Sequence, residues 1–237
     1  MIILDAAPGS PEHMAARLGI PTASMASKLV TPKKLQRSAG ASDAVNRWVA
    51  EWVTGGEDEE WRGTYWTDRG TALEPQARAF FELQTGHQVE DCAFIWRDEK
   101  RDCGCSPDGI VRGYGAAADK AGIVRGDIAG GLELKCPKLA THLKWLDQPD
   151  EVPSDHWLQV QFSLWVTRLP RWWFMSWAGW PNVPPLIVEV EPDDATQGAL
   201  DDVMPEVLGA IARKREWLLS CGVEPQAPML DTQHNPE

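Results

Sequence analysis

The chain has few basic residues for its length. Its 237 residues include 23 lysines and arginines against 35 aspartates and glutamates, which gives a formal net charge of −12. Domains that bind nucleic acid are usually basic, so this balance excludes a broad basic binding face. Any contact with a polyanion must be confined to a local groove where positive side chains gather.

Cysteines are also few and poorly spaced for structural pairing. There are five, an odd number, and no Cys-x-x-Cys spacing occurs. Cys103 and Cys105 form the only close pair, and no second pair completes a zinc site. We therefore expect reduced thiols rather than disulfides, as is typical of cytoplasmic proteins.

Long apolar runs are absent. Only three apolar residues follow Met1 before Asp5, which predicts no signal peptide, and no segment is long enough to cross a bilayer. We expect a cytoplasmic protein without a membrane partner. With 43% hydrophobic residues, the chain can bury one sizeable core. A single domain over residues 1–237 is the simplest organisation, with an irregular arm over 1–12 and a flexible tail over 222–237.

Residues 131–137, Gly-Leu-Glu-Leu-Lys-Cys-Pro, predict a short buried strand. The two-residue period of a strand places Leu132 and Leu134 on one face and Glu133 and Lys135 on the other. On that second face, the acid and the amine can form an ordinary ion pair. Alternatively, the carboxylate can hold a divalent metal while the ammonium stabilises an attacking water and the charge that develops on a phosphorus centre.

A turn precedes this strand. Pro107-Asp108-Gly109 ends 24 residues before Glu133 and is typical of a turn between extended segments. The turn presents Asp108 at the edge of a hairpin that leads towards the Glu133 strand. A second carboxylate is therefore expected beside the first.

Three segments taken together resemble the YqaJ-like viral recombinase family, which includes bacteriophage lambda exonuclease, within the PD-(D/E)xK nuclease superfamily. They are Cys-Ser-Pro-Asp-Gly at 105–109, Gly-Leu-Glu-Leu-Lys-Cys-Pro at 131–137 and Gln-Val-Gln-Phe-Ser-Leu-Trp-Val-Thr-Arg at 159–168. The resemblance covers roughly residues 14 to 180. It implies an α/β fold with a restriction-endonuclease-like PD-(D/E)xK core, in which helices flank a central mixed β-sheet.

The resemblance also implies an active site. Asp108, Glu133 and Lys135 would be catalytic, and metal ligands would come from Glu74, Asp108, Glu133 and the carbonyl of Leu134. Taken alone, Glu74 reads as a solvated helix carboxylate. Three carboxylates at about 4 Å would repel by roughly 4 kcal/mol per pair at an effective dielectric near 20, so the cluster needs cations. The resemblance implies two Mg²⁺ per site, with Mn²⁺ as a substitute.

A second set of residues concerns the end of the substrate. In Arg-Leu-Gly-Ile-Pro-Thr-Ala-Ser at 17–24, Thr22 can cap a following helix, and exposed amides at a helix start favour an anion. The family carries the same pattern. The resemblance implies that Arg17 and Ser24, together with Ser106 and Gln159, bind the 5′-terminal phosphate of DNA.

The remaining pattern is less specific. A basic run at Lys28, Lys33, Lys34 and Arg37 is most simply a solvated face, and His156 stands where the family usually has tyrosine, with an open role. The segment over 112–130 suggests an extended hairpin of unknown role.

Periodicity predicts helices over 42–54, 67–86, 139–146, 155–167 and 193–220, the last interrupted near Pro205, and strands over 89–96, 171–178 and 186–190.

The function implied by the resemblance is a metal-dependent exonuclease. It would degrade one strand of linear double-stranded DNA from 5′-phosphorylated ends to mononucleotides, in the 5′-to-3′ direction, and leave a 3′ overhang for recombination. A homotrimeric ring is implied, with a monomer as the alternative. The resemblance also implies a single-strand annealing protein as a partner. The location would be a bacterial host cytoplasm if a phage or prophage encodes the chain. A structure-specific or endonucleolytic repair nuclease and a non-catalytic DNA-end-binding scaffold remain as alternatives.

Overall fold

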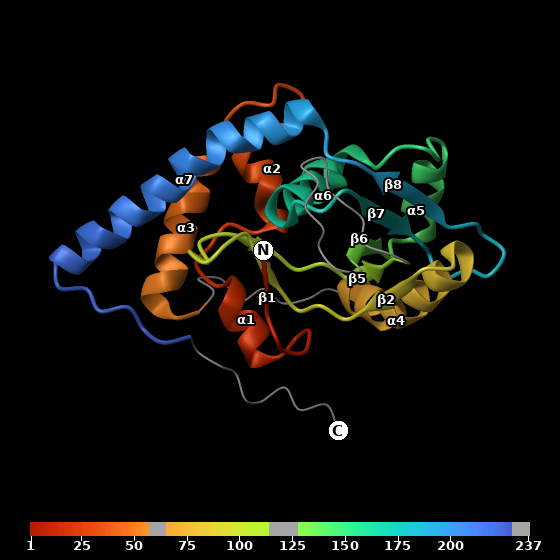
Figure 1. Cartoon of the computed structure of the whole chain (residues 1–237), viewed down its shortest axis with the longest axis horizontal. Coiled ribbons are helices and arrows are strands. Elements are labelled where there is room, and N and C mark those ends of the chain that lie inside the picture. Colours follow the sequence, from red (N-terminus) through yellow and green to blue (C-terminus); the bar gives the residue numbers. More distant parts are fainter. Residues whose placement is uncertain (57–64, 114–127, 229–237) are drawn as a thin grey trace.

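A five-stranded mixed sheet lies in the right half of the view in Figure 1. The computed structural model describes residues 1–56, 65–113 and 128–228. The strand order is β2-β5-β6-β7-β8, in which β6 and β7 are parallel and the other neighbours are antiparallel. The strands are β2 (Gln88–Glu90), β5 (Gly109–Arg112), β6 (Ile128–Lys135), β7 (Trp172–Ser176) and β8 (Leu186–Val190).

The two parallel strands lie in the middle of the sheet and are buried on both faces. All five residues of β7 are buried, which is typical of a strand covered from both sides. Gly131 of β6 allows this close packing, because a Cβ there would lie 2.3 Å from the ring of Trp172. The segment that carries Glu133 is thus buried in the middle of the sheet.

Helices cover the two faces. Helix α4 (Tyr65–Thr85) packs on the face of Leu132 and Leu134, and helix α6 (Ser154–Thr167) packs on the opposite face, against Trp172 and Phe174. Helix α5 (Leu139–Leu146) follows β6. The predicted mixed sheet flanked by helices is therefore confirmed.

A smaller sheet and the N-terminal helices adjoin α6. The sheet has the order β1-β3-β4, and helix α7 (Asp194–Ser220) packs against α3 and α6. The other elements are β1 (Ile2–Ile3), α1 (Pro11–Arg17), a 3-10 turn η1 (Ala23–Met25), α2 (Ala26–Leu29), α3 (Ala41–Thr54), β3 (Ile95–Trp96) and β4 (Gly104–Cys105).

The expected irregular arm over 1–12 needs correction at both ends. Residues 2–3 pair with β3, and α1 begins at Pro11 because Ser10 caps it by accepting the N–H of His13. The flexibility expected for the tail stays a prediction, and residues 223–228 form no helix or strand. The N–H of Gln226 donates to the carbonyl of Val53 at 3.0 Å, which ties this part of the tail to α3.

Two predicted elements were wrong. The strand expected over 89–96 is divided, because its first part pairs with β5 in the large sheet and its last part pairs in the small sheet. The helix expected to break near Pro205 is continuous. Proline removes one helical hydrogen bond, but Met204 and Val207 on either side of Pro205 stay buried in the same core and hold the helix together.

The hairpin expected over 112–130 lies largely outside the described residues, which resume at Ile128. Within the described ranges, no helix has both the length and the apolar character that crossing a membrane requires.

Candidate active site

Strand β6 presents Glu133 and Lys135 on the α6 side of the sheet. Glu133 is 2% exposed, and its Oε1 accepts hydrogen bonds from the Lys135 ammonium and from Nε2 of Gln159 on α6, the latter at 2.6 Å. The neighbouring leucines face α4, as the strand period requires. The predicted acid–amine pair therefore exists, and a third side chain orients its carboxylate.

Asp108 comes directly before β5 and extends the hydrogen bonding between β5 and β6 by one residue. Its N–H donates to the carbonyl of Leu132 at 2.9 Å, and its Oδ2 accepts the N–H of Leu134 at 2.6 Å. In an extended strand, the N–H and C=O of one residue point to the same edge. The carbonyl of Leu134 therefore points towards the Asp108 edge, where no strand of the described chain covers it.

Helix α4 supplies an acid and a guanidinium. Pro75 lies inside this helix next to Glu74, and Arg78 follows one turn later. Nη2 of Arg78 donates to the backbone carbonyl of Asp108 at 2.6 Å, which fixes the turn to α4. Glu74 and Arg78 line one cleft with Asp108, Glu133 and Lys135.

That cleft has a volume of about 520 Å³ and also contains the four residues predicted to bind a phosphate. Residues far apart in the sequence thus meet at one site. The residues of both predicted sets that line it are Arg17, Ser24, Glu74, Ser106, Asp108, Glu133, Lys135 and Gln159.

Burial dominates the electrostatics of this cleft. Desolvation raises the pKa of Glu133 to about 7, against the opposing effect of Lys135, and it also raises the pKa of Asp108. Burial and then the charge of Asp108 raise the pKa of Glu74. Desolvation opposes the charge on Lys135, but the carboxylates of Glu133 and Asp108 outweigh it, so the pKa of Lys135 is raised. The site therefore holds more buried negative charge than one ammonium compensates.

The carboxylates in the cleft, together with the carbonyl of Leu134 at the Asp108 edge of β6, fit a hard divalent cation. Carboxylates and a carbonyl oxygen are the ligands that Mg²⁺ and Ca²⁺ prefer, and a cation would relieve the uncompensated charge. No group of three His, Cys, Asp or Glu side chains among the described residues is already assembled to hold a metal. Repulsion of roughly 4 kcal/mol per carboxylate pair at about 4 Å opposes such an assembly without a cation.

The phosphate residues differ from expectation in two details. Thr22 makes no side-chain cap on η1, and its Oγ1 instead lies 3.3 Å from Oγ of Ser24. Gln159 donates to Glu133, so in this structure its amide orients the Glu133 carboxylate.

The turn that carries Arg17 is clamped from two helices. The N–H of Gly19 donates to Oε2 of Glu51 on α3 at 3.0 Å, and the carbonyl of Gly19 accepts from Nη2 of Arg215 on α7 at 2.6 Å. Gly19 has a φ of +73°, and a Cβ there would meet Arg215 and Trp48. The turn therefore requires glycine, and packing presents Arg17 to the cleft.

Residues 12–170 match the YqaJ-like viral recombinase domain.

The chain belongs to the YqaJ-like viral recombinase family.

Two solved structures of LHK-Exo, an alkaline exonuclease from Laribacter hongkongensis, one of them in complex with dAMP, resemble this YqaJ-like chain. Each has a TM-score of 0.71 and 25% sequence identity, over 90% of this chain and 98% of the other. A phage-related exonuclease from Haemophilus somnus 129PT has a TM-score of 0.55 at 15% identity, over 86% and 96%, which shows a shared fold. No curated protein gives a significant sequence match.

Family and fold are thus confirmed as predicted, and the YqaJ-like match spans every predicted site residue from Arg17 to Gln159. The roles of those residues stay predictions. Sequence reasoning missed His13 and Arg78, which line the same cleft. Each of them lies on a helix, and the sequence around it does not indicate whether its side chain faces a cleft or solvent.

His156, whose role was left open, is partly buried and packs against aromatic rings. Its ring lies 5.3 Å from that of Trp145 and 5.6 Å from that of Phe174. Burial and then the charge of Lys135 lower the pKa of His156 to about 4. It is therefore neutral at physiological pH and adds no positive charge beside Lys135.

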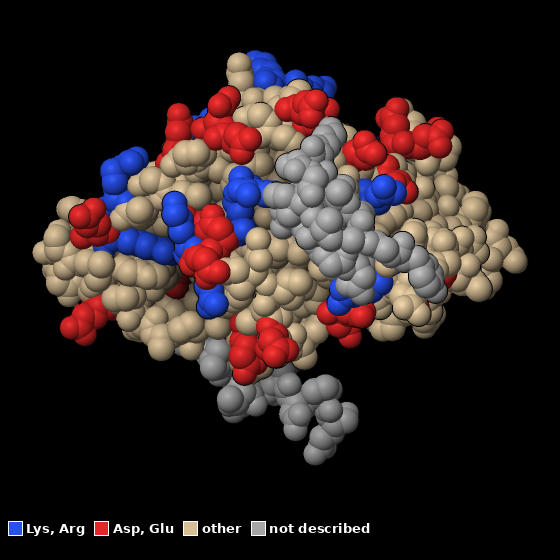
Figure 2. Space-filling view, in the orientation of Figure 1, with Lys and Arg blue, Asp and Glu red and all other residues tan. Residues whose placement is uncertain are grey.

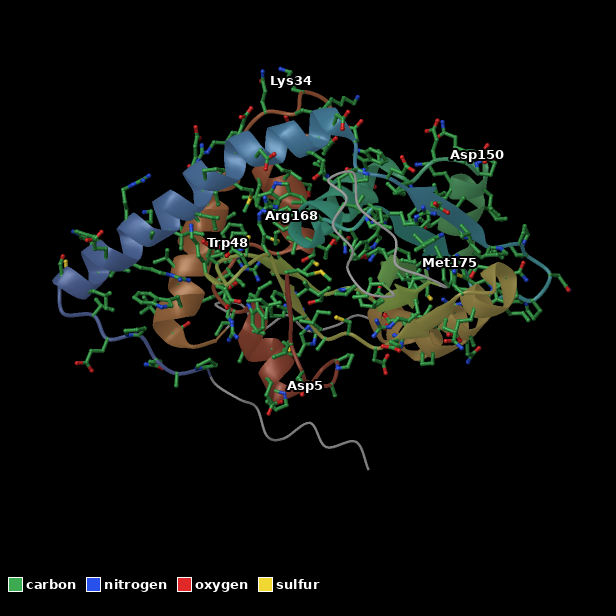
Figure 3. All side chains as sticks on the ribbon, viewed as in Figure 1. Asp5, Lys34, Trp48, Asp150, Arg168 and Met175 are labelled. Carbon is green, nitrogen blue, oxygen red and sulfur yellow. The ribbon has the colours of Figure 1, made fainter. Side chains whose placement is uncertain are left out.

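The basic run from Lys28 to Arg37 is exposed. Lys34 projects from the outer edge of the molecule (Figure 3), and Nε of Arg37 lies 3.9 Å from a carboxylate oxygen of Glu206 on α7. Figure 2 shows acidic and basic side chains interspersed on the visible face. A broad basic surface is absent from that view, as the composition requires.

Proposed function

We propose that this protein degrades one strand of linear double-stranded DNA from a 5′-phosphorylated end, releasing mononucleotides and leaving a 3′ overhang for recombination. Its class of activity, DNA exonuclease, rests on the YqaJ-like family and on the alkaline exonuclease neighbours. The finer proposal rests on one observation: the acidic residues with Lys135 and the residues Arg17, Ser24 and Ser106 line a single cleft.

The acidic residues would hold Mg²⁺, two ions per site, with Mn²⁺ as a substitute. Glu74, Asp108, Glu133 and the carbonyl of Leu134 would hold them. Bound there, the ions would supply an activated water and stabilise the leaving oxygen. The hydrogen bond from the Leu134 N–H fixes one oxygen of Asp108, so the second oxygen is free to orient towards the cleft.

Lys135 would act on the reacting phosphate. Its ammonium is tethered to Glu133 beside the cleft, and its raised pKa keeps it charged at neutral pH. From this position it would orient the attacking water and offset the charge that develops on the phosphorane oxygens. Gln159 would keep the Glu133 carboxylate in place during this step.

Arg17 would recognise the end. A guanidinium forms paired, charge-assisted hydrogen bonds with phosphate oxygens, and the clamped turn at Gly19 presents Arg17 to the cleft. A terminal phosphate held there would place the first phosphodiester bond near the acidic residues. Digestion would therefore begin at the 5′ end and proceed towards the 3′ end.

The test is digestion of linear duplexes that carry a 5′-phosphate or a 5′-hydroxyl, with Mg²⁺ and with each strand labelled separately. The wild type should release mononucleotides from the 5′ end and prefer the phosphate. Arg17→Ala should remove most of that preference, whereas Arg213→Ala, at an exposed site on α7, should keep it. Equal rates on both ends by the wild type would refute end recognition, and cutting of circular duplex would favour an endonuclease.

We propose that the chain assembles as a closed ring of three, which is the assembly that the family resemblance implies. A chain of 26.3 kDa with a net charge of −12 is repelled by DNA at long range and is too small to enclose a duplex. A head-to-tail ring is a common closed assembly, and it would turn Lys28, Lys33, Lys34 and Arg37 towards a channel. Such a ring would retain DNA by topology, and a single-strand annealing protein would receive the overhang. Light scattering should give three times the chain mass; a monomer that digests processively would refute the ring.

A further inference from the structure

His13 connects helix α1 to the turn that carries Asp108. Its side chain is 9% exposed and lines the cleft. Nδ1 of the ring accepts the N–H of Gly9 at 2.9 Å, and Nε2 lies 2.9 Å from Oγ of Ser106, which is 93 residues away in the sequence. Both ring nitrogens are therefore engaged, one by the backbone and one by a residue predicted to bind phosphate.

These contacts fix the position of the ring proton. A backbone N–H can only donate, so Nδ1 must be the unprotonated nitrogen that accepts from Gly9. The proton of the neutral ring then lies on Nε2, which donates to Oγ of Ser106. Burial and then the nearby charge of Arg17 lower the pKa of His13, in agreement with a neutral ring.

The hydroxyl of Ser106 is oriented as a consequence. A free serine hydroxyl rotates and can donate or accept. Because Oγ of Ser106 already accepts from His13, its own proton is available to point into the cleft. Phosphate oxygens are acceptors only, so they match a hydroxyl that is held as a donor. Hydrogen bonds aligned in one direction from Gly9 through His13 to Ser106 also strengthen one another.

We propose that His13 is a positioning residue that commits the Ser106 hydroxyl to donate into the cleft, and thereby selects an anionic group at the DNA end. This inference rests on the proposed end recognition and adds the residue that sets its donor. His13 itself touches no substrate. Its effect passes through Ser106 and disappears when Ser106 has no hydroxyl.

The test measures kcat/KM on duplexes with a 5′-phosphate and with a 5′-hydroxyl, and takes their ratio within each variant, so that differences in the amount of folded protein cancel. His13→Asn can still accept from Gly9 but is too short to reach Ser106, and should lower the ratio about tenfold. His13→Gln places an amide N–H near the position of Nε2 and should restore most of the preference.

Two further variants separate positioning from general loosening of α1. Ser10→Ala removes the cap of the same helix without touching Ser106, and should keep the ratio. In a double-mutant cycle, His13→Asn added to Ser106→Ala should lower the ratio no further than Ser106→Ala alone.

The outcomes distinguish the two levels of the hypothesis. A wild type without any preference would refute end recognition, and the role of His13 with it. A wild-type preference that survives in His13→Asn would overturn only the role of His13. Additive effects in the double-mutant cycle would also overturn only the role of His13. So would a fall of the ratio in Ser10→Ala as large as that in His13→Asn.

Discussion

Replacing Glu133 by glutamine is expected to stabilise the metal-free protein at alkaline pH. Glu133 is 2% exposed, and burial raises its pKa from 4.5 to about 7 despite Lys135. A carboxyl whose pKa is higher in the folded than in the unfolded state binds its proton more tightly when folded. The free energy of unfolding therefore falls as pH rises between about 4.5 and 7.

The size of this effect follows from the pKa difference. Each unit corresponds to about 1.4 kcal/mol, so ionised Glu133 costs about 3 kcal/mol at pH 8 and about 1 kcal/mol at pH 5. Glutamine resembles the protonated acid and avoids the cost. In a chain of this length, about 3 kcal/mol corresponds to a rise in Tm of about 6–12 °C.

Thermal unfolding in the presence of a chelator measures the effect. Glu133→Gln should unfold at a higher temperature than the wild type near pH 8 and show most of that gain lost near pH 5. Glu216→Gln, at an exposed position on α7, should change little at either pH. With millimolar Mg²⁺ the advantage of the variant should shrink, because a ligand that binds the folded state stabilises it and the variant has lost a donor.

The reasoning would be refuted by a Glu133→Gln variant that is less stable than the wild type near pH 8 without metal. An equal gain at both pH values would refute it as well, since the effect would then be unrelated to ionisation.

Three other predictions concern the same machinery. Lys135→Ala should abolish release of mononucleotides while circular dichroism shows a folded protein, because the charge beside Glu133 is lost; near-normal digestion would contradict the mechanism. Gly19→Ala should lower the free energy of unfolding by about 1–3 kcal/mol, because φ is +73° and the added Cβ would meet Arg215 at 3.0 Å; an unchanged Tm would contradict the clamp. Ca²⁺ should protect the protein against heat but support little digestion, since its coordination is larger and looser than that of Mg²⁺; equal digestion with both ions would contradict this.

The parts of the site that are local in sequence could be predicted. The alternation in β6 fixes the faces of Glu133 and Lys135, and the Pro-Asp-Gly turn places Asp108 beside them. The family resemblance predicted that Arg17 and three other residues bind the same phosphate, and these residues line one cleft. The strand period and the turn preferences act over a few residues, so they suffice to predict the faces of Glu133 and Lys135 and the turn at Asp108.

Contacts between distant segments could not be predicted in this way. Nothing near His13 in the sequence indicates Ser106, and the division of the 89–96 segment between two sheets depends on partners elsewhere in the chain. The break predicted at Pro205 was wrong for the same reason, because burial of its neighbours outweighs the tendency of proline to interrupt a helix. Tertiary packing decided each of these cases.

The hydrogen bond from Arg215 to Gly19 spans 196 residues and begins in a helix that follows the matched family segment. During synthesis, the Arg17 turn leaves the ribosome long before α7 exists. Domains are made from the N-terminus at a limited rate, so the turn lacks one side of its clamp until α7 has been made. A fragment that ends after β8 would keep the acidic residues and Lys135 but would hold Arg17 loosely. If the proposed roles hold, such a nascent or truncated chain would carry the residues proposed for cleavage before the residue proposed for end recognition is fixed in place.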